Sequence, residues 1–352
     1  MADTQLTARV RRPFNLKIFV MRLRTIIALL VIVGIFAALS RQFLTIENIL
    51  IMTQHVAVNA FLAIGMTFVI VSGGIDLSVG SIMGLTGMVI GALIDIGIPL
   101  HILGVVVYLH TWFILVIALM VGGLMGAANG FIITKLRVAP FIATLGMLYV
   151  ARGLALLSNN GSTFPFLNGQ PGLGNAGFPF IGEGSILSIP VPIWILLVVG
   201  LSAAFIAKRT PFGRHVYAVG GNERAAGLSG VRVNRIRFQV YVISGVLAAV
   251  SGIVVTSQLV AAHPATGQSY ELNAIAAAVL GGTSLMGGRG TIGGTVIGAF
   301  VIGILADGLI MVGVSDFWQM VIKGLVIIVA VAIDQLQANV SQAAAIREEK
   351  RG

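Results

Sequence analysis

Long apolar stretches separated by short polar segments make up most of this 352-residue chain. Charged residues account for only 10% of it, against about 25% in soluble domains, and its mean hydropathy is +1.01. A chain of this composition has lipid as its main solvent. Its length allows roughly ten helices of about 20 residues with short connections. The sequence therefore predicts an all-α polytopic membrane protein with one membrane domain over residues 25–335.

Ten segments are long and apolar enough to be predicted as membrane-spanning helices. They cover residues 25–40, 48–71, 77–97, 112–134, 140–158, 191–207, 238–261, 272–285, 291–312 and 317–333. A basic segment, 1–24, precedes the first, and a polar tail, 336–352, follows the last. With ten spans, both ends of the chain lie on the same side of the membrane.

The distribution of Lys and Arg indicates which side that is. Nearly all 22 of these residues fall in the N-terminal segment, the tail and alternate connections, seven of them in the connection 208–237. Lys and Arg concentrate on the cytoplasmic side of membrane proteins, so we expect both termini to be cytoplasmic. The net charge of +10 therefore reflects the two sides of a membrane protein rather than a nucleic-acid surface. Too few aromatic residues alternate with the basic ones for nucleic-acid binding.

The chain lacks the residue patterns of an enzyme. It has no cysteine, and its five histidines form no metal-binding or catalytic motif. None of its lysines ends a phosphate-binding Gly-x-x-x-x-Gly-Lys-Ser/Thr loop. We therefore expect a transport protein without a cofactor or metal of its own, whose energy enters through a partner subunit or an ion gradient.

The longest connection on the opposite side, 159–190, is rich in glycine and proline and contains no Lys or Arg. Such a segment cannot form a regular membrane-spanning element. Two interpretations stay open. It can be a surface that meets a partner or gates an entrance, or a passive connection packed over the helices.

A weak internal repeat relates two parts of the chain at an offset of 214 residues. Asn59 then matches Asn273, and the pair Gly73 and Gly74 matches the pair Gly287 and Gly288. Duplicated apolar segments broken by glycine are a recurrent feature of transporters, where the breaks line the translocation path. The alternative is close helix packing through small residues, which 45 glycines would provide in any bundle.

The connection 208–237 contains the most distinctive polar sequence. An acid at Glu223, the small residues Ala225 and Ala226, and Gly230 at the end have the spacing of a short helix flanked by basic residues. A compact cytoplasmic helix of this kind suits docking into a partner's groove. The simpler interpretation is a solvated basic loop, which explains the charges but not the run Gly220-Gly221-Asn222-Glu223.

Three phrases resemble the permease family of ribose, xylose and galactose type ABC importers. They are SGGIDLSVGS at 72–81, VGGNERAA at 219–226 with LSG at 228–230, and AVLGGTS at 278–284 with GGRG at 287–290. The resemblance covers residues 25–335 and implies a permease dimer in the bacterial inner membrane that imports a monosaccharide or small polyol. It also implies a cytoplasmic ATP-binding subunit, which would hold ATP and Mg²⁺, and a periplasmic sugar-binding protein.

Carried over by position, the resemblance makes the segment 220–230 the coupling helix that contacts the ATP-binding subunit. The residues concerned are Gly220, Gly221, Asn222, Glu223, Ala225, Ala226 and Gly230. Arg224 stands where the wider coupling-loop consensus of ABC importers has Ala, so the match is to the sugar branch.

Candidate residues for the translocation path come from the repeat and from the first phrase. They are Asn59, Gly73, Gly74, Asp76, Asn273, Gly287 and Gly288. An ion-coupled secondary transporter is the main alternative, with Asp76, Glu271 and Asp307 as candidate ion-binding acids, and a channel or structural subunit is the third. Asp76 fits a helix N-cap equally well.

Asp307 and Lys323 are two charges inside adjacent predicted spans. The connection between these spans centres near Ser315, eight residues from each, so an antiparallel hairpin would place them at similar depth and permit an ion pair. Alternatively, Lys323 extends alone to the outer interface.

Overall fold

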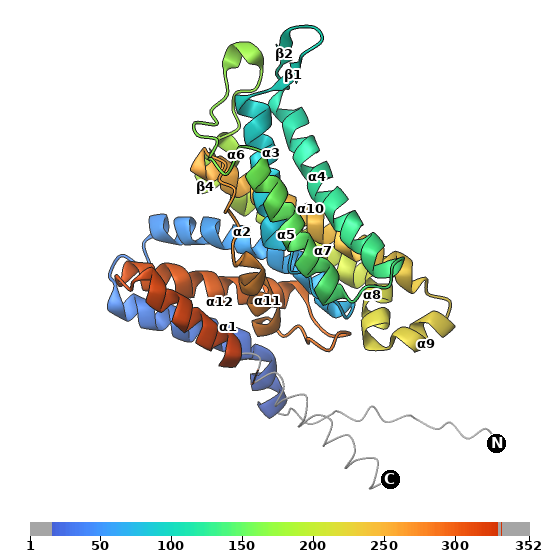
Figure 1. The fold of residues 1–352 in the computed structure, drawn as a ribbon. Helices are drawn as coiled ribbons and strands as arrows, with labels where there is room; N and C mark the ends of the chain where they lie inside the picture. The colour runs from blue at the N-terminus through green and yellow to red at the C-terminus, as the bar shows by residue number, and fades with distance from the viewer. Residues whose placement is uncertain (1–15, 330–331, 333–352) are drawn as a thin grey trace, which may run out of the picture.

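The computed structural model describes residues 16–329 and residue 332. The predicted tail 336–352 and most of the basic segment 1–24 lie outside this range. Helices make up most of the described part (Figure 1), which confirms the predicted all-α class.

The helices follow one another with short connections. They are α1 (Leu16–Leu39), α2 (Ile46–Val71), α3 (Val79–Asp95), α4 (Thr111–Thr134), α5 (Pro140–Leu157), α6 (Phe180–Glu183), α7 (Val191–Arg209), α8 (Pro211–Gly221), α9 (Glu223–Leu228), α10 (Val233–Leu259), α11 (Tyr270–Leu280) and α12 (Ile292–Met311), with a last helix over 316–329. A 3-10 turn, η1, covers Pro171–Leu173.

Two small antiparallel hairpins complete the described structure. One pairs β1 (Ile98–Leu100) with β2 (Val105–Val107), and the other pairs β3 (Ser185–Ile186) with β4 (Ile189–Pro190). The first hairpin projects from the top of the molecule in Figure 1, and all six of its strand residues are exposed.

Each predicted span falls on a helix, but three boundaries differ by five residues or more. Helix α10 begins at Val233, five residues before the predicted start at Phe238. Helix α1 begins at Leu16, nine residues before the predicted start at Thr25, and α11 ends at Leu280 rather than at Leu285. Gly282, with φ of 89°, ends α11. With 11 residues, α11 is roughly 16 Å long at about 1.5 Å per residue, only half of the roughly 30 Å hydrocarbon core.

Six helices are long and apolar enough to cross a membrane: α2, α4, α5, α7, α10 and α12. In α2, 83% of the most apolar 18-residue window is buried, whereas in α7 only 22% of the corresponding window is buried. Helix α2 contacts α7, α10, α11 and α12, and it lies between them in Figure 1. It is therefore the central helix of the bundle, while most residues of α4, α5 and α7 lie at the surface of the molecule.

Small residues bring α4 and α10 into close contact. Gly122, Gly126 and Gly130 follow one another at intervals of four along α4, so they share one face. A Cβ at Gly122 would collide with the carbonyl oxygen of Gly245, and one at Gly126 with that of Tyr241. For these glycines the packing interpretation is correct, because only a residue without a side chain lets the two backbones approach this closely.

The connection 159–190 packs onto the helices rather than standing free. Phe164 exchanges backbone hydrogen bonds of 2.9 Å with Ala262 in both directions, and the Ser257 hydroxyl donates to the carbonyl oxygen of Phe178 at 2.7 Å. Gln54 of α2 donates to the carbonyl oxygen of Gly182. The connection thus rests on the C-terminal end of α10 and near the N-terminal half of α2.

Candidate coupling site and polar cavity

The connection 208–237 contains two helices, α8 and α9, rather than the single predicted one. Gly220 and Gly221 are the last residues of α8. Asn222 is extended, with φ of −161°, and its side-chain oxygen accepts from the Ala225 backbone N–H at 2.9 Å. Asn222 therefore stops α8 and caps α9, and Gly230, with φ of 86°, follows the end of α9. The predicted helix 220–230 is correct only from Glu223 to Leu228.

Glu223 anchors the start of α9 to α10. Arg237 donates to both carboxylate oxygens of Glu223, over 2.9 and 2.7 Å. This is the two-pronged geometry in which Arg binds a carboxylate most specifically. Ala226 is buried against the bundle and Ala225 is exposed, so α9 has one seated face and one free face.

Four glycines bring α8 against the end of α2. Gly288, in the connection between α11 and α12, donates its N–H to the Val71 carbonyl oxygen over 2.9 Å. A Cβ on Gly220 would overlap that same oxygen, and a Cβ on Gly288 would lie 2.7 Å from the Cα of Gly221. We call Gly220, Gly221, Gly287 and Gly288 together with Val71 the glycine contact.

A second bond supports the glycine contact. The Tyr217 hydroxyl of α8 donates to the Gly290 carbonyl oxygen at 2.8 Å. Burial raises the pKa of this hydroxyl, so it stays protonated and able to donate. These contacts join α8 to the end of α2 and to the connection between α11 and α12.

The repeat-related glycine pairs lie at the same end of α2. Gly73, with φ of 85°, follows that end, and the Gly74 N–H donates to the Val69 carbonyl oxygen at 2.9 Å. A Cβ on Gly74 would collide with the hydroxyl of Tyr241. Both pairs thus belong to the region next to α8, whereas Asn59 and Asn273 lie deeper in the bundle.

Asp76 is enclosed in a hydrogen-bond network. Its carboxylate accepts from the Ser78 N–H at 3.0 Å, from the Ser78 hydroxyl at 2.6 Å and from the Ser244 hydroxyl at 2.8 Å. Asn129 donates in turn to the Ser78 hydroxyl at 2.9 Å. The N-cap of α3 is Ser78 and not Asp76. Asp76 instead ties the start of α3 to α4 and α10.

A polar cavity of about 320 Å³ lies between α2, α10, α11, α12 and the last helix. Both predicted asparagines, Asn59 on α2 and Asn273 on α11, line it. Its other lining residues are His55, Val58, Val255, Gln258, Tyr270, Ile302, Gly303, Ala306, Asp307, Ile310 and Lys323. Asn59 and Val71 are twelve residues apart on α2, roughly 18 Å at about 1.5 Å per residue, so α2 connects this polar cavity with the glycine contact.

The expected ion pair between Asp307 and Lys323 is not formed. Oδ1 of Asp307 instead lies 3.3 Å from Nδ1 of His55, within the distance of a hydrogen bond or an ion pair. Lys323 lines the same cavity, but within residues 25–329 no nitrogen of it comes within 4 Å of a carboxylate. Both side chains line the cavity, but the Asp307 carboxylate is bonded to His55 of α2 instead of to Lys323.

The sequence interpretation missed His55, Gln258 and Tyr270 as cavity residues. Two spacings carried a signal, since His55 precedes Asn59 by four residues and Tyr270 precedes Asn273 by three. Residues spaced in this way share one face of a helix. Gln258 gave no comparable signal.

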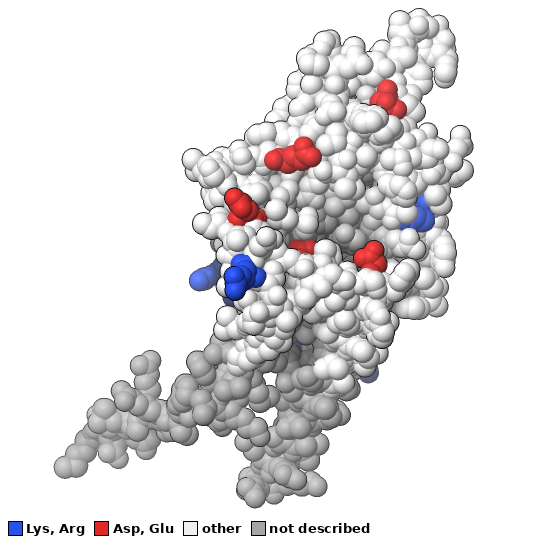
Figure 2. All heavy atoms as spheres, turned by 90° about the vertical axis from the view of Figure 1, so that its left-hand side faces the viewer, with Lys and Arg blue, Asp and Glu red and all other residues white. Residues whose placement is uncertain are grey.

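A second cavity of about 600 Å³ adjoins the polar cavity. His55, Val255, Gln258 and Tyr270 line both, and Gln54 and Glu183 line only the second, which we call the outer cavity. Figure 2 shows the face toward which the N-terminal part of α2 points, with acidic side chains around and within a hollowed area. The outer cavity places the polar one within reach of the connection 159–190.

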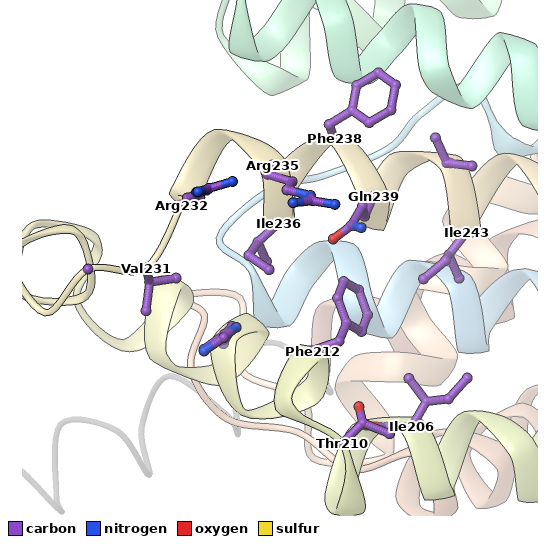
Figure 3. Close-up of a pocket in the computed structure, with 13 residues that line it drawn as sticks. Ile206, Thr210, Phe212, Val231, Arg232, Arg235, Ile236, Phe238, Gln239 and Ile243 are labelled. Atoms are coloured by element: carbon purple, nitrogen blue, oxygen red, sulfur yellow. The ribbon is translucent and has the colours of Figure 1, made fainter.

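A groove of about 820 Å³ separates α7 and α8 from the N-terminal half of α10. Figure 3 shows Phe212 and Ile206 on one wall, with Ile236 and Ile243 opposite and Arg232 and Arg235 at the α10 end. Because this space lies between them, α8 and α10 touch only over a small part of their length.

The three acids considered for ion coupling lie in different places. Asp76 is in the buried network, Asp307 lines the polar cavity, and Glu271 lies beside Gly80, where an added Cβ would come 2.6 Å from its carboxylate. Over the described part of the chain, no three His, Asp or Glu residues gather as a metal site would require.

Comparisons with known proteins match the whole helical region. The family model described as "Branched-chain amino acid transport system / permease component" matches residues 45–331. The ribose import permease protein RbsC of Escherichia coli K12 is 44% identical over 94% of this chain and 98% of its own length, and that of Haemophilus influenzae is 42% identical over 91% and 95%. The xylose transport system permease protein XylH of Escherichia coli K12 is 33% identical over 92% and 93%.

No solved structure matches the chain. The family model and these relatives confirm the resemblance that the three sequence phrases indicated. The chain is a multi-pass membrane protein and a transport component rather than an enzyme, and it belongs to the permease family of ABC sugar importers.

Proposed function

We propose that this chain carries a monosaccharide across the bacterial inner membrane as one subunit of an ATP-driven importer. The relatives named as ribose and xylose permeases support the substrate class. The glycine contact supports the coupling, because it joins the exposed helix pair α8–α9 to the central helix of the bundle. The chain crosses the membrane ten times in this proposal, with both termini cytoplasmic. Helix α11 is too short to cross alone, and the non-helical stretches between Ala262 and Gly288 complete that crossing.

Three partners complete the importer in this proposal. A cytoplasmic ATP-binding subunit, which holds ATP and Mg²⁺, docks on the exposed face of α9. A second permease copy or a paralogue forms the dimer, and a periplasmic sugar-binding protein meets the opposite side near the connection 159–190. ATP binding draws the two α8–α9 pairs together.

Transmission of that movement follows the contacts already described. The groove beside α10 leaves α8 room to tilt, while the Tyr217 bond and the glycine contact hold α8 to α2 and to the connection between α11 and α12. Helix α2, buried over most of its length, moves as a rigid element. Its movement changes access to the polar cavity from the two sides of the membrane.

Uptake into cells or proteoliposomes tests the energy source. We expect sugar uptake by the assembled transporter to stop with vanadate, which blocks ATP hydrolysis by ABC subunits, and to continue with an uncoupler that collapses the proton gradient. The opposite pattern would support ion-coupled transport and reject the proposal. Uptake that survives both treatments would identify a channel.

Glu223→Lys is expected to weaken coupling without preventing insertion of the permease. The change replaces the bond to Arg237 by repulsion between two cations, which frees the start of α9. Because the pair is partly exposed, the free energy of unfolding should fall by no more than about 1 kcal/mol, while binding of the ATP-binding subunit in a pull-down should fall clearly. The exchange Glu223→Arg with Arg237→Glu should restore part of the binding, and an unchanged pull-down with Glu223→Lys would contradict the assignment.

A further inference from the structure

Three side chains that line the polar cavity each carry a buried polar atom without a hydrogen-bond partner among the described residues. These atoms are Oδ1 of Asn59, Nε2 of Gln258 and Oδ2 of Asp307. Buried polar groups in folded proteins are nearly always hydrogen-bonded, and the exceptions call for an explanation. Here they come from three different helices and belong to side chains that line one cavity, which indicates a missing ligand rather than three separate packing faults.

We propose that the polar cavity binds the transported molecule, a neutral polyhydroxylated ligand of monosaccharide size, through Asn59, Gln258 and Asp307. This inference rests on the proposed function and names the residues that hold the substrate inside the membrane domain. The unpartnered set offers two acceptors and one donor. A sugar hydroxyl both donates and accepts, so neighbouring hydroxyls of one ring can satisfy all three atoms.

Size and lining agree with such a ligand. The cavity volume of about 320 Å³ lies at the lower end of the roughly 300–1,000 Å³ found for small-molecule sites. The apolar side chains of Val58, Ile302 and Ile310 also line it and can contact the C–H groups of a sugar ring. A branched-chain amino acid carries its polar groups at one end only, and its apolar side chain offers no hydrogen bond to the remaining atoms of this set.

His55 is a positioning residue in this site. It holds Oδ1 of Asp307 over 3.3 Å, which leaves Oδ2 as the carboxylate oxygen without a partner. His55 and Gln258 also line the outer cavity. A ligand arriving through the outer cavity therefore meets these two side chains first.

The internal repeat gives independent support. Asn59 and Asn273 occupy equivalent positions at the offset of 214 residues, and they line one cavity from α2 and α11. Two equivalent amides thus reach the same space from two repeated segments, which is how inverted or duplicated halves build a central site in other transporters.

Protection of an introduced cysteine tests the inference directly, because the native chain contains no cysteine. The Asn273→Cys variant, purified with its ATP-binding subunit, would be labelled with a small water-soluble methanethiosulfonate reagent. We expect saturating D-ribose or D-xylose to slow the labelling, and leucine to leave it unchanged. Asn168→Cys, an exposed residue in the connection 159–190, is the matched control whose labelling no ligand should alter.

Second substitutions identify the binding residues. Added to the Asn273→Cys variant, Asn59→Leu or Asp307→Asn should raise the sugar concentration that gives half-protection by about three- to tenfold, the effect of one lost hydrogen bond. Thr283→Val removes another buried hydroxyl that lacks a partner but lies outside the cavity, and it should leave half-protection unchanged.

The outcomes separate this inference from the proposed function. Equal labelling with and without sugar, while the native transporter still shows vanadate-sensitive sugar uptake, would overturn the cavity site and leave the function standing. Protection by leucine but not by the sugars would also overturn it. Sugar protection in a transporter whose uptake resists vanadate would support the site and reject the ATP-driven function.

Discussion

Gly220→Ala should lower ATP-driven uptake by about tenfold or more. The reason is that the change forces a methyl group into a packed contact, which costs about 1–3 kcal/mol. The new Cβ would overlap the Val71 carbonyl oxygen and lie 2.7 Å from the Gly288 backbone nitrogen. Both neighbours are backbone atoms, so no side chain can rotate away. Helix α8 would have to separate from the end of α2.

The neighbouring glycine provides a matched control. A Cβ at Gly221 would meet nothing within 4 Å, and alanine favours a helix over glycine, so Gly221→Ala should insert, bind the ATP-binding subunit and transport normally. Uptake, ATPase activity and partner pull-down would be measured for both variants. We expect Gly220→Ala to retain the partner and its ATPase activity but to lose uptake. Equal uptake by the two variants would show that the glycine contact does not transmit the movement.

Hydropathy located the helices well because the lipid core demands long apolar runs. It could not locate the ends that other forces determine. Helix α1 begins nine residues before its predicted start, and α11 stops at Leu280, five residues before its predicted end. Glycine conformation determines the end of α11, because all three glycines within 282–288 adopt positive φ.

The candidate sites, like the helices, could be predicted from the sequence only in part. The phrase around Glu223 predicted a cytoplasmic helix, and the helix exists, but only the structure shows that Asn222 divides the segment in two. The repeat paired Asn59 with Asn273, and these residues do line one cavity. The partner of Asp307 could not be predicted, because His55 lies 252 residues away in sequence and the rotation of each helix about its axis decides which side chains meet.

Asp76→Ala should lower the free energy of unfolding by about 3–5 kcal/mol, the range typical of breaking a buried charged network. The carboxylate is fully buried and accepts three hydrogen bonds from Ser78 and Ser244. Removing it leaves two hydroxyls and one N–H without their acceptor and opens a space between α3 and α10. Thermal unfolding in detergent would measure the loss. Asp95→Ala, at an exposed position at the end of α3, should change the free energy of unfolding by no more than about 0.5 kcal/mol.

Asp76→Asn separates the structural role of this residue from a role in ion coupling. Asparagine has nearly the same shape and keeps one oxygen acceptor, but it replaces the other oxygen with an amide donor, so it can keep only part of the network. We expect a smaller loss of stability than with alanine, and uptake that falls in proportion to the folded protein and remains sensitive to vanadate. An ion-coupled transporter would behave differently, because neutralising its ion-binding acid would abolish uptake while the protein stayed as stable as the native chain. That second outcome would contradict both the structural role of Asp76 and the ATP-driven mechanism.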